Sequence, residues 1–158
     1  MKEDIVLKHE DIYQLNLTLT RVLDAGLAEL VMIINKSGRL ITSQSESSDM
    51  DTISIAALVS GSFASSGSIA NLIGEEEFTT LYQEGKDFHL LVQQIDENNI
   101  LTIIFTGART NLKRMKLSIA DHIEQLRPIL KKLYKDFASD PFLNLDVSGY
   151  QNEEAIPA

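Results

Sequence analysis

The sequence of 158 residues contains no cysteine, only three prolines and few basic residues. Without cysteine there is no disulfide framework, no thiol nucleophile and no thiolate metal site. The 14 lysines and arginines are outnumbered by 23 aspartates and glutamates, which gives a net charge of −9. Because nucleic-acid binding needs basic side chains clustered on the contacting face, nucleic acid is not an expected partner.

Long apolar runs and targeting signals are also missing. No uninterrupted apolar run approaches the roughly 18 residues that span a bilayer. The start of the chain, residues 1–4, is too acidic for a secretory signal. We therefore expect a cytoplasmic protein that does not insert into a membrane. Its length fits one domain with a tail.

The apolar pattern predicts eight elements in the order α-β-β-α-β-β-β-α. Glycines at 26 and 74 are expected to stop the first two helices, and Asp51 to cap the second. Five strands, with the central helix on one face and the terminal helices on the other, would form a three-layer α/β sandwich with a mostly antiparallel sheet. The domain is expected over residues 1–138, followed by a tail at 139–158. The predicted helices are residues 10–25, 52–73 and 110–137, and the predicted strands are 30–34, 39–43, 78–83, 88–95 and 100–106.

Candidate catalytic and metal-binding residues are scattered. His9, His89 and His122 lack metal-ligand spacing. The glycines of residues 61–67 are separated by five residues and no lysine follows, so the segment is not a phosphate-binding loop. The acidic run 75–77 has no second acidic cluster at a recognisable spacing. We expect no metal, no cofactor and no enzymatic activity of the chain's own.

A basic cluster interrupts the acidic sequence near the start of the last helix. It consists of Lys113, Arg114 and Lys116. A solvated helix face is the simpler interpretation of such a cluster, and an acidic partner surface is the other.

The central helix is unusual because no charged residue occurs between Thr52 and Gly74. One side is expected to pack on the sheet, and it carries large apolar residues. The other side carries small residues, including glycines that cost about 1 kcal/mol each in a helix. Such a side is either a contact with another protein or buried inside the domain. The expected sheet side is Ile55, Leu58, Val59, Ile69 and Ile73, and the opposite side is Ile53, Ala57, Ser60, Gly61, Ala64, Gly67, Ser68 and Asn71.

Several segments resemble the bacterial branch of the Roadblock family. The similarity is most specific over residues 51–78, in the stretches Asp-Thr-Ile-Ser-Ile-Ala-Ala-Leu and Ile-Ala-Asn-Leu-Ile-Gly-Glu-Glu-Glu-Phe. It extends to residues 34–41 and 83–85, and together these segments cover most of residues 10–137. The chain is thus identified as similar to a family of small regulatory proteins.

The resemblance implies a Roadblock fold and a homodimer formed through edge strands, here residues 77–83 with Phe78, Leu81 and Tyr82. It further implies that the paired central helices bind a Ras-like small GTPase of the MglA type and stimulate GTP hydrolysis without an arginine finger. The family is associated with cell polarity and gliding motility, and with recruitment to a cell pole. The GTPase-binding positions carried over from the family are Ala57, Gly61, Ala64, Ser65 and Ser68.

Two other functions compete with GTPase activation. Other Roadblock proteins are scaffold or adaptor subunits without activating activity. A small-molecule sensor would need a pocket with converging polar groups, and the sequence indicates none.

Overall fold

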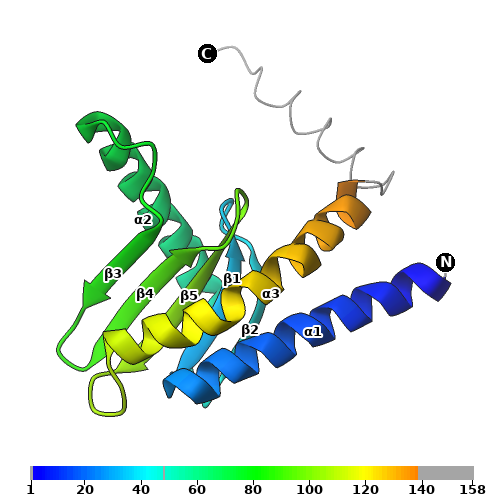
Figure 1. Cartoon of the computed structure of the whole chain (residues 1–158), viewed down its shortest axis with the longest axis horizontal. Helices are drawn as coiled ribbons and strands as arrows, with labels where there is room; N and C mark the ends of the chain where they lie inside the picture. Colours follow the sequence, from blue (N-terminus) through cyan, green and yellow to red (C-terminus); the bar gives the residue numbers. More distant parts are fainter. Residues whose placement is uncertain (1, 48, 139–158) are drawn as a thin grey trace.

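The computed structural model describes residues 2–47 and 49–138, and it forms a three-layer sandwich (Figure 1). The five strands build one antiparallel sheet in the order β2-β1-β5-β4-β3. The predicted fold class and element order are confirmed, while the tail at 139–158 lies outside the described residues. The elements are α1 (Lys2–Gly26), β1 (Leu30–Asn35), β2 (Leu40–Ser45), α2 (Thr52–Ile73), β3 (Thr80–Glu84), β4 (Phe88–Gln94), β5 (Asn99–Thr106) and α3 (Leu112–Ala138).

The sheet separates two apolar cores. Side chains of β1 alternate between them, since Val31 and Ile33 face α1 and α3 whereas Met32 and Ile34 face α2. Figure 1 shows α1 and α3 lying together on one face of the sheet and α2 on the other. The α2 face is the thinner core, because one helix covers it.

Gly26 lies at the contact between α1 and α3. A Cβ built at Gly26 would lie 2.5 Å from the Cε of Met115, so a larger residue would displace the end of that flexible side chain. The Ser118 hydroxyl donates a hydrogen bond to the Val22 carbonyl at 3.0 Å across the same seam. At the end of α1, the residue that adopts the left-handed backbone conformation is Leu27, at φ 59°. Gly26 therefore serves helix packing and is the last residue of α1, which corrects the expectation that it stops the helix.

Both ends of α2 are capped as predicted. The Asp51 carboxylate accepts a hydrogen bond from the Ser54 backbone N–H at 3.1 Å and one from the Ser54 hydroxyl at 2.6 Å. These bonds favour the charged carboxylate and lower the pKa of Asp51. At the other end, Gly74 adopts φ 88° and its N–H bonds to the last turn. The capping interactions of Asp51 and Gly74 thus determine where this uncharged helix begins and ends.

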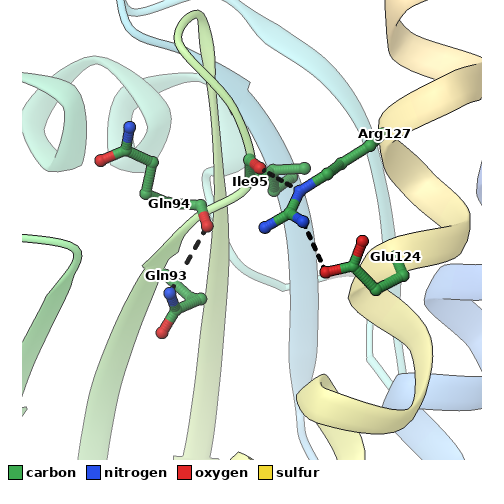
Figure 2. Close-up of polar contacts among 5 residues, drawn as sticks. All are labelled: Gln93, Gln94, Ile95, Glu124 and Arg127. Atoms are coloured by element: carbon green, nitrogen blue, oxygen red, sulfur yellow. Dashed lines mark hydrogen bonds and ion pairs between the residues drawn. The ribbon is translucent and has the colours of Figure 1, made fainter.

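Arg127 fastens α3 to the turn between β4 and β5 (Figure 2). Its Nε donates to the Ile95 carbonyl oxygen at 2.7 Å, and one terminal nitrogen pairs with Glu124 at 2.5 Å. Close by, the Gln93 side-chain amide donates to the Gln94 carbonyl at 3.4 Å. The guanidinium of Arg127 thus adds a polar contact between α3 and the sheet to the apolar packing of the two layers.

Candidate functional site

The side of α2 that packs on the sheet differs from the predicted one. Val59 is buried as expected, but Leu58, Ile69 and Ile73 are 73%, 54% and 66% exposed. Ser60, expected to face outward, is buried and donates to the Lys36 carbonyl at 2.6 Å. Relative to the predicted orientation, α2 is rotated about its own axis. Small residues and one phenylalanine face the sheet instead of the largest apolar residues. The buried residues are Ala56, Val59, Ser60, Phe63, Ser66 and Ala70.

The outward side of α2 is an uncharged surface with large apolar side chains. Ile53 is 74% exposed and Leu72 is 87% exposed. All five residues predicted to bind a GTPase lie on this side. Exposed contiguous apolar surface of this kind marks a contact with another molecule. We call it the α2 surface, and it comprises Ile53, Ala57, Leu58, Gly61, Ala64, Ser65, Ser68, Ile69 and Leu72.

The polar groups within the α2 surface are turned back onto their own helix. The hydroxyl of Ser65 donates to the Gly61 carbonyl at 3.0 Å, and that of Ser68 donates to the Ala64 carbonyl at 3.3 Å. Because their hydroxyls bond to their own helix, these serines present only small side chains to a neighbouring molecule. The interpretation that this helix is buried on both sides within the domain is wrong for the part of the chain that the structure describes.

No contact within the described domain requires a glycine at position 61. A Cβ added there meets nothing within 4 Å, although glycine costs a helix about 1 kcal/mol relative to alanine. A position that sacrifices helix stability without a close neighbour is consistent with another protein lying against it.

We expect Gly61→Ala to stabilise the chain by about 1 kcal/mol in denaturant unfolding. The same methyl group should weaken association with a protein bound on this surface by about 5- to 150-fold, because overpacking costs about 1–3 kcal/mol. Gly67→Ala is the matched control, since that position also has open space but is half-buried on the flank of the helix. Unchanged association in both variants would show that nothing packs on Gly61.

A groove runs between α2 and β3. It encloses about 620 Å³ and is open to solvent. Its walls come from helix α2, including part of the α2 surface, and from two residues of β3, so the helix and the strand form one continuous region. The lining residues are Ala57, Leu58, Gly61, Ser62, Ser65, Ser66, Ile69, Leu81 and Gln83.

Strand β3 is one edge of the sheet and pairs only with β4 among the described strands. The Thr79 carbonyl accepts from Gln94 and the Gly85 N–H donates to Phe88, so odd-numbered residues bond inward. By the alternation of antiparallel pairing, the backbone groups of Thr80, Tyr82 and Glu84 point away from the sheet. These groups form a free edge that another strand could extend.

The residues predicted for dimerisation lie at this edge. Leu81 and Tyr82 belong to β3 and are half-buried, Leu81 against the α2 core and Tyr82 against the other core. Phe78 lies two residues before the strand, which begins at Thr80 and ends at Glu84. The predicted strand therefore began two residues too early.

Three stacked rings pack together beside the free edge of β3, on the sheet face that α1 and α3 cover. This stack was not predicted from the sequence. The buried ring of His89 lies 5.1 Å from that of Phe105 and 6.2 Å from that of Tyr82. The Tyr82 hydroxyl is 3.3 Å from the Nδ1 of His89. Burial raises the pKa of Tyr82, and the nearby Glu84 charge raises it further. The cross-strand pairing of β3 with β4 could have revealed this contact.

Helix α2 is also, among the described helices, the one long and apolar enough by length and composition to cross a membrane. The expectation above concerned uninterrupted apolar runs, whereas this helix meets the composition criterion because its serines, glycines and threonine are polar but uncharged. The indication is weak, since core helices of other proteins meet the same criterion. A third of the segment, 33%, is buried inside the domain.

The described residues contain no group of three or more histidines, aspartates and glutamates that could hold a metal ion. His9, His89 and His122 lie on α1, β4 and α3. His122 bonds its own helix through Nδ1, 2.8 Å from the Ser118 carbonyl.

This fold, with an exposed apolar helix beside a free sheet edge, defines a class of interaction module, and the sequence agrees. The model of the Roadblock/LC7 domain family matches residues 14–105, and the chain belongs to this family. Membership is consistent with a regulator rather than an enzyme. A search of curated proteins found no match.

Among solved structures, the chain is similar to MglB of Myxococcus xanthus. The two share 31% identity over 77% of this chain and 90% of that one, with a TM-score of 0.71. The gliding protein MglB of Thermus thermophilus shows the same fold at 22% identity, over 77% and 92% of the chains, with a TM-score of 0.72. A further structure, described as MglB with tetrameric arrangement, shares 22% identity over 73% and 86%, with a TM-score of 0.68.

Proposed function

We propose that the chain is a cytoplasmic homodimer that binds a Ras-like small GTPase of the MglA type and stimulates its GTP hydrolysis. The observation that carries the proposal is the α2 surface, which is uncharged, apolar and outward-facing. By its likeness to MglB, the protein acts in cell polarity or gliding motility and is recruited to a cell pole.

Dimerisation is proposed to occur through β3. Two copies related by a twofold axis would join their free edges into one continuous sheet. The exposed apolar side chains beside β3, Leu58 and Ile69, support this arrangement because the second copy would cover them. The rest of the two α2 surfaces would then form one platform for a single GTPase.

Activation is proposed to arise from differential binding. A platform that fits the hydrolysis-competent conformation of the GTPase better than its other conformations shifts the population toward that state. Small residues and glycine suit this role, because they permit close approach of another backbone. The chain itself supplies no reacting group in this mechanism.

The arginines of the chain are poorly placed to act on the nucleotide of a partner. None occurs in α2. Arg109 is paired with Glu29 at 2.9 Å, and the Nε of Arg114 donates to the Ala25 carbonyl at 2.9 Å. Arg21 and Arg39 are exposed, but they belong to α1 and to the turn before β2.

Single-turnover GTP hydrolysis with saturating regulator tests this mechanism. We expect Arg39→Ala, Arg109→Ala and Arg114→Ala each to change the stimulated rate by less than about tenfold, whereas loss of an arginine finger costs about 10³–10⁵. Hydrolysis without the regulator gives the baseline. A drop of about a hundredfold in one variant, with binding retained, would show that a finger exists. Binding without stimulation by the unmodified chain would instead indicate an adaptor.

A further inference from the structure

The basic cluster predicted from the sequence borders a groove at the start of α3. It is shallow and open to solvent, with a volume of about 530 Å³, and it is lined by Leu112, Lys113, Lys116 and Leu117. Leu117 is 60% exposed, and both lysines are exposed. The groove lies on the helix pair that covers the sheet face opposite α2, so the function proposed above does not involve it.

The two lysines of this groove have no acidic partner among the described residues. The ion pairs of the described chain join Arg109 to Glu29, Arg127 to Glu124 and Lys132 to Asp11. In a protein with a net charge of −9, two unpaired ammonium groups beside exposed leucine form a site for an acidic segment with apolar side chains.

We propose that residues 150–156 of the same chain, Tyr-Gln-Asn-Glu-Glu-Ala-Ile, dock into this groove. Glu153 and Glu154 would pair with Lys113 and Lys116, while the apolar side chains at either end of the segment contact the leucines. Residues 139–158 contain four acidic residues and no basic one, so their charge complements the groove.

The length of the connecting chain selects this segment. The axial distance from Lys116 to Ala138 along α3 is about 33 Å at 1.5 Å per residue. The twelve residues 139–150 span at most about 40 Å when extended, so residues beyond 150 reach the groove. Asp146, only eight residues past Ala138, spans about 26 Å and falls short.

A weak contact is sufficient for docking because the acidic segment and the groove belong to the same chain. Exposed ion pairs are individually weak, but a tether of this length within one chain gives the segment an effective concentration of about millimolar. The occupant most available to the groove is therefore the chain's own acidic segment.

Nuclear magnetic resonance on the full chain tests the docking. Because the chain lacks cysteine, Asn152→Cys provides a single site for a paramagnetic label. We expect the label to attenuate amide signals of residues 112–120 more strongly than those of residues 130–133. Attenuation confined to residues near the end of α3 would overturn the proposal, since a freely moving tail spends most time there.

Charge variants identify the contacts. Lys113→Glu with Lys116→Glu should abolish the attenuation, and so should 1 M NaCl, where the Debye length is about 3 Å. Lys131→Glu is the matched control, because Lys131 is an exposed lysine of the same helix outside the groove and its reversal should change nothing. Attenuation that survives the double reversal would contradict the docking.

Two further experiments exclude unfolding of the variant and contact between different chains as explanations. Adding Glu153→Lys and Glu154→Lys to the double reversal should restore the attenuation, which an unfolded variant could not do. Mixing isotope-labelled chain with spin-labelled chain should remove it; persistence would place the contact between chains and overturn docking within one. The measurements need no GTPase, so their outcome is independent of the proposed activity.

Discussion

Replacing Ala64 or Ser68 with arginine is expected to abolish GTPase binding while the domain remains folded. Both residues are exposed on the α2 surface, so the longer side chain meets nothing within the isolated chain. In the complex it would bury an unpaired charge, which costs several kcal/mol and weakens binding by at least about a hundredfold. Titration of the fluorescently labelled GTPase measures the affinity.

Ala120→Arg provides the matched control for these variants. It makes the same change at an exposed alanine of α3, on the opposite side of the sheet. We expect it to bind the GTPase normally. The account fails if Ala64→Arg and Ser68→Arg also bind normally, or if circular dichroism shows that they are unfolded.

Prolines on the free edge of β3 are expected to convert the dimer to a monomer. Thr80→Pro with Glu84→Pro removes two outward N–H groups from each chain, thus four hydrogen bonds from a symmetric pair. At about 0.5–1.5 kcal/mol per bond the dimer loses about 2–6 kcal/mol, which weakens association by about 30-fold to 10⁴-fold. Light scattering should show twice the 17.6 kDa chain mass for the unmodified protein and a single chain mass for the variant.

Gln83→Pro distinguishes loss of the dimer from loss of the fold. By the alternation of the strand, the Gln83 N–H points inward toward β4, so proline there should destabilise the sheet itself. An unmodified chain that is monomeric at micromolar concentration would contradict the proposed dimer. So would a double-proline variant that stays dimeric.

The fold could be predicted because periodicity and turn residues agree along most of the chain. The rotation of α2 could not, since the prediction assumed that the largest apolar residues face the sheet. Instead Ala56 and Ala70 allow close packing, and Leu58 and Leu72 face outward. These exposed leucines depart from the usual rule that large apolar residues are buried.

Other features depend on contacts between distant segments. The close approach of Gly26 to Met115 and the stacking of Tyr82 on His89 follow from tertiary packing. The small residues predicted for the site lie on the exposed side of α2. The uncharged character of this helix over 22 residues is visible without a structure. The large apolar residues beside them were assigned to the core and proved to be part of the exposed surface.

The most direct test of the central claim is single-turnover GTP hydrolysis by the cognate Ras-like GTPase, measured with and without the full chain. We expect saturating chain to accelerate hydrolysis, with Ala64→Arg giving the unstimulated rate. Equal rates with and without the unmodified chain, under conditions in which a complex forms, would contradict the claim.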